Sequence, residues 1–242
     1  MIEIFAELAS TSDKVMRRMA KGKPVPEGHW IIADRQTHGR GRHGRSWFDG
    51  AGNFMGSTFV ERKHGDPAPS TLSLVAALAV HEVVSRHVGS EHQIQLKWPN
   101  DLLVDGAKIA GILLEGVQGG VVIGVGVNLT VAPKLLDRPT TAILRVGTAP
   151  DRDSFTVEMA DSFDIEIARW REHGLAPIIR RWLASAHPIG TPLVVLEGQG
   201  QELRGTFAGL AADGALQLRL ADGATRAIHA GEVSLDAATR QG

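Results

Sequence analysis

The chain has 242 residues, of which 43% are hydrophobic, so it can bury a sizeable core in one large domain or in a large domain with a small partner. Its 26 Lys and Arg residues balance 27 Asp and Glu residues, and the net charge of -1 argues against a protein that coats nucleic acid. The absence of cysteine excludes disulfides, thiolate nucleophiles and cysteine-bound metals.

The sequence shows no signal for export or membrane insertion. Its longest apolar run, residues 74–80, is far shorter than the ~20 residues that span a bilayer. The first ten residues, MIEIFAELAS, carry acids where a secretory signal would carry positive charge. We therefore expect a cytoplasmic protein without a membrane span.

The first third of the chain predicts a helix, two strands and a second helix. Ser10, Thr11 and Ser12 offer hydroxyl caps to a short helical pattern. Ser70 is the candidate N-cap of a longer, core-packing helix. The expected strands cover residues 30–33 and 54–60, and the second helix covers residues 72–83.

A hairpin and a buried strand follow. Residues 94–98 are expected to be extended, and Asp105-Gly106 is a strong hairpin signal between residues 102–104 and 107–115. Residues 121–129 are almost wholly apolar, as in a strand that is covered on both faces.

The C-terminal part of the chain changes from helices to short strands. Two amphipathic helices are expected around residues 155–170 and 175–182, with Gly174 between them. Beyond Pro188, four β-rich runs are separated by turns; they cover residues 193–196, 203–210, 215–220 and 225–229. The predicted division is a large domain of residues 1–187 and a small β domain of residues 188–242.

The stretch GRGRHGRSW, residues 39–47 and here called the Gly/Arg loop, concentrates positive charge on a pliable backbone. Guanidinium groups and backbone N–H groups of such a loop can converge on one anion, of which phosphate is the natural example. Trp47 offers a flat surface on which a purine can stack. The alternative is a mobile basic loop beside a buried tryptophan.

Two further segments carry candidate functional residues. In KWPND, Lys97 and Asp101 surround a proline that must end the strand. Lys108 then alternates with apolar residues and is either a snorkelling lysine or one that faces an anion. The apolar residues that we expect on its face are Ala110, Ile112 and Leu114.

Gly124 and Gly126 lie inside the predicted buried strand, which ends near Asn128. Glycines at such positions allow close approach of another backbone or of a flat ligand, although tight packing explains them equally well.

These segments, in this order, closely resemble the biotin protein ligases over essentially the whole chain. The matching stretches are STS at 10–12, Gln36, GRGRHGR at 39–45, KWPNDL at 97–102, AKIAGIL at 107–113 and GVGVNL at 124–129. The resemblance implies an α+β fold with a mixed β-sheet, related to the catalytic domain of class II aminoacyl-tRNA synthetases. A small SH3-like β-barrel domain would follow it.

The family joins biotin to ATP, releases pyrophosphate, and transfers biotin from biotinyl-5′-AMP to a lysine of a biotin carboxyl carrier protein domain. The resemblance implies Lys108, Arg40 and Arg42 as catalytic residues, with Lys108 between the biotin carboxylate and the α-phosphate. Asp101 is a candidate helper for deprotonating the carrier lysine. Mg²⁺ is expected as the counterion of ATP, held mainly by phosphate oxygens.

The resemblance also implies two sets of binding residues. The biotin-binding residues would be Ser10, Thr11, Ser12, Gln36, Gly39, Arg40, Gly41, Arg42, Lys108 and Gly111. The ATP- and adenylate-binding residues would be Arg40, Arg42, Arg45, Trp47 and Asn128.

The sequence departs from the family pattern at two positions. Ser12 replaces an asparagine, which weakens the expected biotin contact there, and His43 replaces a basic residue.

The chain begins almost at the catalytic segment, so we expect a monofunctional ligase without an operator-binding domain. Family members commonly pair through the central sheet, so a homodimer is a further expectation that no residue pattern here decides.

Two alternatives stay open. A lipoate protein ligase would share the fold but change the acyl group. A nucleic-acid-binding module would use the Gly/Arg loop as a basic arm, although the balanced charge and the lack of an aromatic-rich basic face argue against it.

Overall fold

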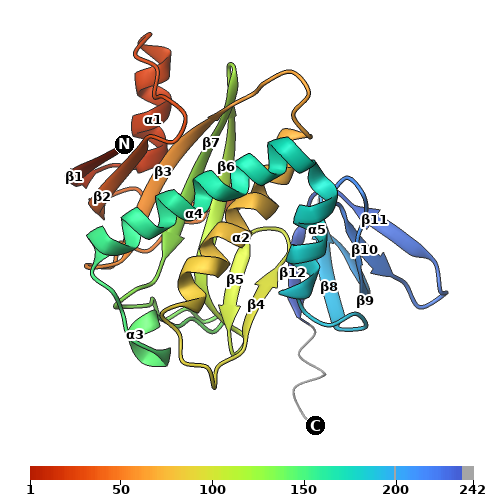
Figure 1. Ribbon diagram of the computed structural model, residues 1–242. Coiled ribbons are helices and arrows are strands. Elements are labelled where there is room, and N and C mark those ends of the chain that lie inside the picture. Colours follow the sequence, from red (N-terminus) through yellow and green to blue (C-terminus); the bar gives the residue numbers. More distant parts are fainter. Residues whose placement is uncertain (199, 236–242) are drawn as a thin grey trace.

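Two β-sheets organise the chain (Figure 1). The computed structural model describes residues 1–198 and 200–235. A mixed seven-stranded sheet has the order β1-β2-β3-β7-β6-β5-β4, with β1 parallel to β2 and the other pairs antiparallel. A five-stranded antiparallel sheet has the order β11-β10-β9-β8-β12.

The strands of each sheet and the helices have the following bounds. The strands of the large sheet are β1 (Ile2–Leu8), β2 (Trp30–Gln36), β3 (Phe54–Glu61), β4 (Ile94–Lys97), β5 (Asp101–Val104), β6 (Ala107–Val117) and β7 (Gly120–Val127). Those of the small sheet are β8 (Pro192–Glu197), β9 (Gln201–Leu210), β10 (Leu216–Arg219), β11 (Thr225–Ile228) and β12 (Glu232–Leu235). The α-helices are α1 (Thr11–Ala20), α2 (Leu72–Ser85), α3 (Ile143–Val146), α4 (Arg152–His173) and α5 (Leu175–Ala184), and η1 (Arg42–Gly44) and η2 (Pro69–Thr71) are 3-10 helices.

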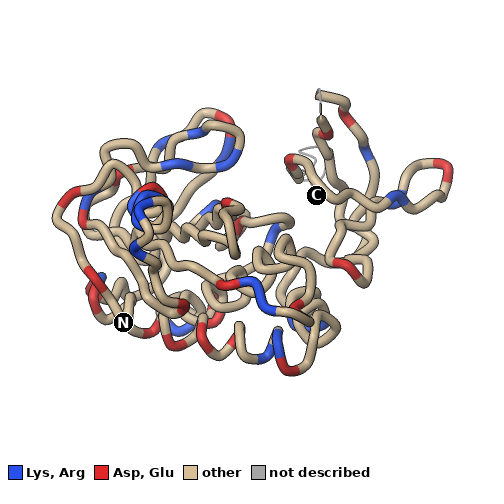
Figure 2. The backbone as a smooth tube through the Cα atoms, turned by 90° about the horizontal axis from the view of Figure 1, so that it is seen from above, with Lys and Arg blue, Asp and Glu red and all other residues tan. Residues whose placement is uncertain are grey.

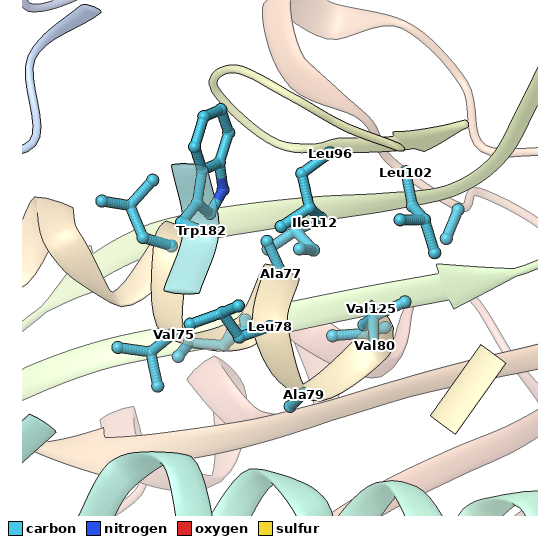
Figure 3. Close-up of a cluster of buried hydrophobic side chains, with 14 of the residues drawn as sticks. Val75, Ala77, Leu78, Ala79, Val80, Leu96, Leu102, Ile112, Val125 and Trp182 are labelled. Atoms are coloured by element: carbon cyan, nitrogen blue, oxygen red, sulfur yellow. The ribbon is translucent and has the colours of Figure 1, made fainter. Parts of the chain in front are cut away.

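The helices divide between the two faces of the large sheet. On one face, α2 and α4 pack over the strands, and α5 lies beside α2 towards the small sheet (Figure 1). Figure 3 shows Leu78 and Val80 of α2 among Leu96, Ile112 and Val125 from the sheet. On the other face, α1 covers β2, β3 and β7, so this face has a second, smaller core.

The alternation along β7 confirms that the strand is covered on both faces. Its odd-numbered residues 121–127 belong to the core beneath α2 and α4, whereas Val122 belongs to the core beneath α1. The even positions Gly124 and Gly126 also face the α1 side, where an added Cβ at Gly124 would lie 2.8 Å from Ser12 Oγ. The two glycines therefore let other side chains pack closely on the face of the sheet that carries the site.

Most of the predicted helices and strands are confirmed, but one predicted helix cap is wrong and two edge strands were not predicted. The Asp105-Gly106 turn joins β5 to β6 with φ angles of 49° and 75°, as a type I′ hairpin requires. Ser70 is not the N-cap of α2; it lies in η2, and Thr71 precedes the helix without a capping side-chain bond. The edge strands β1 and β12 were not predicted, because both are short or half-exposed and lack a clear apolar alternation.

The small sheet packs against the large one through a continuous core. Leu193, Phe207 and Leu216 belong to the same hydrophobic cluster as α2 and the large sheet. Trp98 Nε1 also donates a hydrogen bond to the Gly214 carbonyl at 3.2 Å. The mixed α+β class is confirmed, while the division at residues 187 and 188 stays a prediction. In the described ranges, 1–198 and 200–235, no helix is long and apolar enough to cross a membrane.

Candidate functional site

A cavity of about 500 Å³ lies on the α1 side of the large sheet, bordered by the Gly/Arg loop and by β12. It gathers residues that are far apart in the sequence. The predicted residues that line it are Ser10, Thr11, Ser12, Gln36, Arg40, Gly41, Arg42, Arg45, Trp47, Lys108, Gly111 and Asn128. Gly39 does not line the cavity; it is buried at the base of the loop, where a Cβ would lie 3.0 Å from the Trp47 carbonyl oxygen.

The Gly/Arg loop folds back on itself as a small hairpin. The Trp47 N–H donates to the Gly39 carbonyl at 2.9 Å, and the Gly41 N–H donates to the Arg45 carbonyl at 2.7 Å. At its tip, His43 and Gly44 both have positive φ, 54° and 74°. Gly44 thus serves a defined tight turn, and the loop is a hairpin rather than an irregular basic arm.

Trp47 lies directly over a pair of glycines on neighbouring strands. Gly111 of β6 and Gly126 of β7 are register partners. An added Cβ would lie 2.9 Å from the indole at Gly111 and 2.2 Å from it at Gly126. Of the two explanations left open for Gly126, the structure shows close packing of this indole. Its buried Nε1 has no hydrogen-bond partner among the described residues.

Lys108 reaches the cavity because the pairing of β5 with β6 shifts register beside it. Leu102 pairs with Ala110, whereas Leu103 pairs with Lys108, so β6 carries one extra residue as a bulge. Ala110 and Ile112 pack into the core beneath α2, while the Lys108 ammonium lies beside Gly111 on the opposite face. The prediction that Lys108 shares a face with Ala110, Ile112 and Leu114 is therefore wrong, since the bulge breaks the alternation.

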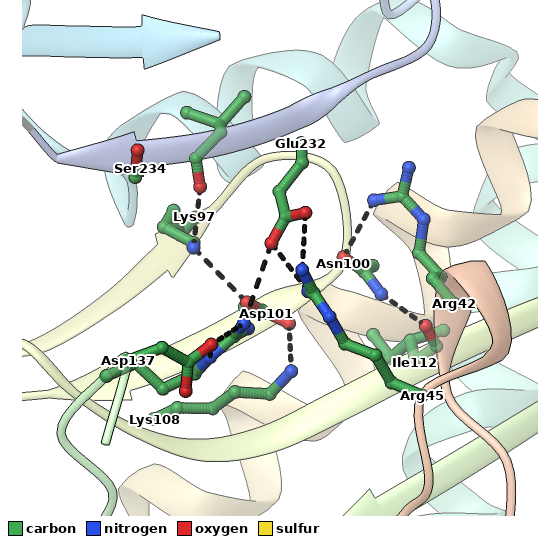
Figure 4. Close-up of polar contacts among 12 residues, drawn as sticks. Arg42, Arg45, Lys97, Asn100, Asp101, Lys108, Ile112, Asp137, Glu232 and Ser234 are labelled. Atoms are coloured by element: carbon green, nitrogen blue, oxygen red, sulfur yellow. Dashed lines mark hydrogen bonds and ion pairs between the residues drawn. The ribbon is translucent and has the colours of Figure 1, made fainter. Parts of the chain in front are cut away.

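Asp101 binds two lysines at the floor of the cavity (Figure 4). Its Oδ1 lies 2.5 Å from Lys108 Nζ, and its Oδ2 lies 3.3 Å from Lys97 Nζ. Burial raises the pKa of Asp101, but the two lysines outweigh it and hold the pKa below its usual value. Burial lowers the pKa of Lys97, and Asp101 opposes that shift. The carboxylate is thus ionised and fixes the direction of the Lys108 side chain.

The three loop arginines are each held by protein acceptors. Arg40 lies 2.6 Å from Asp13 of α1 and 2.8 Å from Glu115 of β6. Burial raises the pKa of Glu115, and Arg40 opposes the increase. These contacts anchor Arg40 towards α1 rather than towards the lysine pair.

Arg42 and Arg45 connect the Gly/Arg loop to the small sheet (Figure 4). Arg42 donates to Asn100 Oδ1 at 3.2 Å and to the Gly231 carbonyl at 2.9 Å. Burial lowers the pKa of Arg42. Arg45 forms a bidentate pair with Glu232, with distances of 2.5 and 2.6 Å. A polyanion in the cavity would have to compete with these neutral and acidic acceptors.

Hydroxyl and amide groups form a second polar cluster at the start of α1. The Gln36 Oε1 accepts from the Thr11 N–H at 2.7 Å and from Thr11 Oγ1 at 3.1 Å. Ser57 Oγ contacts Thr11 Oγ1 at 2.7 Å and Ser12 Oγ at 3.0 Å. Ser10 caps the helix, as predicted, by accepting from the Asp13 N–H. Such a cluster suits a small ligand that needs both donors and acceptors.

Among the residues to which sequence reasoning gave no role, Asn100, Arg138 and Glu232 line the cavity, whereas Ser57 is not part of the lining and contacts the hydroxyls of Thr11 and Ser12. Ser57 is hidden within an apolar strand, and Asn100, although part of the quoted motif, received no role. Arg138 and Glu232 also line the cavity, from the loop after β7 and from β12. Arg138 carried only a weak signal, as one of two cations, with Lys134, in the segment after β7. Glu232 carried none, because its position depends on how the two sheets pack.

Asn128 also lines the cavity and lies directly after β7. Its Nδ2 donates to the Thr141 carbonyl at 3.0 Å, and its buried Oδ1 has no partner among the described residues. An unpartnered buried acceptor in a cavity wall is expected to bind a donor of a ligand.

Comparisons with known proteins agree with this geometry. Residues 7–131 match the Biotin/lipoate A/B protein ligase family, and residues 193–236 match the Biotin protein ligase C terminal domain. A biotin--[acetyl-CoA-carboxylase] ligase of Paracoccus denitrificans is 39% identical over 78% of this chain and 83% of its own length. The enzyme of that name from Mycobacterium tuberculosis is 34% identical over 96% of this chain and 88% of its own length.

The fold is also that of solved ligases. The structure of the biotin protein ligase from Aquifex aeolicus in complex with biotin and ATP superposes with a TM-score of 0.82, at 25% identity, over 97% of each chain. On these matches and on the arrangement of the cavity, the chain belongs to the biotin/lipoate A/B protein ligase family.

Proposed function

We propose that this protein activates biotin with ATP to form biotinyl-5′-AMP and then transfers biotin to a lysine of a biotin carboxyl carrier protein domain. The relatives of known function are biotin ligases, and a solved relative holds biotin and ATP. The observation that carries the proposal is the cavity itself, which combines a hydroxyl and amide cluster with a cationic wall. Its charged lining residues are Arg40, Arg42, Arg45, Lys97, Lys108 and Arg138 against Asp101, Asp137 and Glu232.

The excess of positive charge addresses the central obstacle of the reaction. The carboxylate of biotin must approach the α-phosphate of ATP, and the two anions repel each other. Lys108 is placed to lie between them, since its ammonium already lies on the cavity side, fixed by Asp101. A preorganised donor of this kind stabilises the transition state without having to reorganise.

The first step forms a bond from a carboxylate oxygen of biotin to the α-phosphorus and breaks the bond to pyrophosphate. We assign Arg42 and Arg45 to the phosphates, which requires them to exchange Asn100 and Glu232 for phosphate oxygens. Arg40 would then steady the base of the loop through Asp13 and Glu115. Arg138 is a further cation for the departing pyrophosphate.

Binding of the ring system and the base uses the remaining groups. We assign the ureido ring of biotin to the cluster of Ser10, Thr11, Ser12 and Gln36, to which Ser57 adds a hydroxyl. Ser12 is shorter than the asparagine of the family pattern, and Ser57 fills part of the hydrogen-bonding role. Adenine would stack on Trp47 and meet the free Oδ1 of Asn128.

In the second step, the amine of the carrier lysine attacks the acyl carbon and AMP leaves. The lowered pKa of Asp101 makes it a weak base toward that amine. Its role is instead to hold Lys108 in place. Another base must therefore take up the proton of the amine, and we assign this role to the phosphate of the departing AMP.

Mg²⁺ enters the proposal only as the counterion of ATP. Within residues 1–198 and 200–235, no group of three His, Asp or Glu side chains could hold a metal ion. The cavity carboxylates are already bound to lysines and arginines. The residues present do not form a protein cage for Mg²⁺, and phosphate oxygens and water would have to supply its ligands.

Several finer features of the proposal follow from the family resemblance. The large sheet would correspond to the catalytic fold of class II aminoacyl-tRNA synthetases, and the five-stranded sheet to an SH3-like barrel. A cytoplasmic location, a homodimer, and activity without operator binding stay predictions.

The function is tested by incubating the protein with biotin, ATP and Mg²⁺ and measuring pyrophosphate release and the mass of the adenylate. Adding a carrier domain should then increase the carrier mass by one biotin. Lipoate in place of biotin should give neither product, and turnover with lipoate alone would establish the lipoate alternative. Salt-dependent binding to random duplex without any turnover would favour the nucleic-acid alternative.

Lys108→Ala provides the sharpest variant. We expect adenylate formation to fall by at least about 100-fold, the usual effect of losing one transition-state donor, while thermal unfolding stays cooperative. Lys21→Ala, at the exposed end of α1, is the matched control and should retain full activity. Equal activity of both variants would show that Lys108 is only a packed surface lysine.

A further inference from the structure

A buried asparagine joins the two loops that border the cavity. Asn53 is 1% exposed and lies directly before β3. Its Oδ1 accepts hydrogen bonds from the backbone N–H groups of Leu129, Thr130 and Val131, at 3.0, 3.0 and 3.2 Å. Its Nδ2 donates to the Val131 carbonyl at 2.7 Å. One side chain thus fixes three consecutive residues of the loop after β7.

A second contact supports the same junction. Thr130 Oγ1 donates to the Ala51 carbonyl at 2.7 Å. Gly50 allows the close approach, since an added Cβ would lie 2.4 Å from Asn53 Nδ2 and 2.9 Å from Val131. We call residues 50–53 together with residues 129–131 the loop clasp.

The clasp continues a strand pairing beyond its end. Phe54 and Val127 form the last register pair of β3 with β7, and the two chains then leave the sheet as loops. Without a ladder, nothing in the backbone pairing fixes the distance between these loops. The Asn53 side chain takes over that role by satisfying the backbone groups that the ladder no longer binds.

The two joined loops each lead to a residue that lines the cavity. The segment before the clasp carries Trp47, and the segment after β7 carries Asn128 immediately before Leu129. Both Trp47 and Asn128 line the cavity, whereas Asn53 does not. Asn53 can therefore affect a ligand only through the residues that it positions.

We propose that Asn53 is a positioning residue for the nucleotide, which holds Trp47 and Asn128 at the spacing that an adenine needs. The inference rests on the proposed function, because the proposed function assigns the adenine of ATP to Trp47 and Asn128. The hydroxyl cluster at Thr11 and Gln36 lies on α1 and β2 and makes no contact with the clasp through the hydrogen bonds described. Loss of Asn53 should thus separate nucleotide binding from biotin binding.

The experiment compares Asn53→Leu, Asn53→Asp and the wild type in steady-state adenylate formation. Asn53→Leu removes both hydrogen-bonding groups at similar volume, and we expect the KM for ATP to rise at least about tenfold. The Kd for biotin, measured without ATP, should stay within about twofold. Asn53→Asp keeps the acceptor for the three N–H groups but loses the donor to the Val131 carbonyl, so its KM for ATP should lie between those of the wild type and of Asn53→Leu.

Thr58→Val is the matched control. Thr58 lies on β3, the strand that Asn53 precedes, and is fully buried, and its hydroxyl donates to the His29 carbonyl at 2.9 Å, away from the clasp. This variant should lose a comparable buried hydrogen bond without a change in the KM for ATP. If Asn53 has a purely structural role, Asn53→Leu and Thr58→Val should both show a lower folded fraction and a lower kcat. The KM for ATP should then be unchanged in both of these variants.

The outcomes separate the inference from the proposed function. A wild-type protein that forms no adenylate would overturn both. An active wild type together with an unchanged KM for ATP in Asn53→Leu would overturn the inference alone. If Asn53→Leu does not fold, Thr130→Val removes the second contact at a part-exposed position. It should raise the KM for ATP about threefold, and an unchanged KM would then overturn the inference.

Discussion

Single side chains at the junction of the two sheets set the charge state of the cavity floor. Asp101 stays ionised because Lys97 and Lys108 bind it, and Lys97 also donates to the Val233 carbonyl of β12 at 2.9 Å. Close to this junction, His187 is 9% exposed and its Nε2 has no partner among the described residues. Burial lowers its pKa to about 4, with a smaller contribution from the charge of Lys97. The histidine is therefore neutral in the folded protein at neutral pH.

This histidine predicts a pH dependence of stability. Its pKa in the folded state, about 4, is below the usual histidine value of 6.5, so the unfolded chain binds the proton more readily. Its contribution is fully present above pH 6.5 and is lost as the pH falls toward about 4, by at most about 3 kcal/mol. Below pH 4 the loss levels off.

The measurement is the free energy of unfolding in urea at several pH values across this window, for the wild type and for His187→Gln. The variant should lose less stability on acidification, because it lacks the buried group that must take up a proton. His64→Gln, on an exposed loop, controls for the loss of a histidine as such. Parallel pH profiles for wild type and His187→Gln would contradict the prediction.

At the scale of elements, a bulge and a glycine pair turn two ordinary antiparallel strands into the wall of a site. The bulge in β6 directs Lys108 to the cavity while Ile112 stays in the core. Gly111 and Gly126 then form a flat surface that the Trp47 indole covers. The position of the indole is thus decided by missing side chains on the strands beneath it.

Gly126→Ala tests this arrangement. The new Cβ would lie 2.2 Å from the indole, so Trp47 must move. We expect adenylate formation to fall at least about tenfold, which corresponds to about 1.4 kcal/mol in activation free energy. Gly116→Ala, on the exposed part of β6 with open space around it, should be fully active. Activity at the wild-type level in Gly126→Ala would show that the indole position does not matter for the reaction.

At the scale of the whole molecule, the cavity lies where the two sheets meet. Figure 2, viewed from above, shows the small sheet standing beside the large one rather than enclosing it. The contact is made by the shared core and by polar contacts of Arg42, Arg45 and Lys97 with residues 231–233. A ligand in the cavity is therefore expected to stabilise both sheets together.

Thermal unfolding tests this coupling. The protein should unfold in a single transition, and a ligand at 100 times its Kd adds about 2.7 kcal/mol. For a chain of this size, that increase raises the Tm by roughly 5–10 °C. Biotin with ATP and Mg²⁺ should raise the Tm more than biotin alone, and Lys108→Ala should lose this extra increase. Two separate transitions, of which the ligand shifts only one, would contradict the coupling.

The local sequence was sufficient for most elements and for the residue types of the site. The Ser10 cap, the Asp105-Gly106 turn and the apolar spacing of α2 and α4 depend on neighbours within a few residues, so they can be read without the fold. The resemblance to biotin protein ligases rested on contiguous motifs, and the family is confirmed by the comparisons. The roles of the individual site residues stay predictions.

Tertiary structure alone decided where these residues point and what they contact. The bulge that redirects Lys108 arises from the pairing of β5 with β6, and the indole over Gly126 arises from the packing of a loop on a sheet. Glu232 reaches Arg45 across 187 positions of the chain. Contacts of this kind depend on register and on the docking of distant segments, which no local pattern of residues encodes.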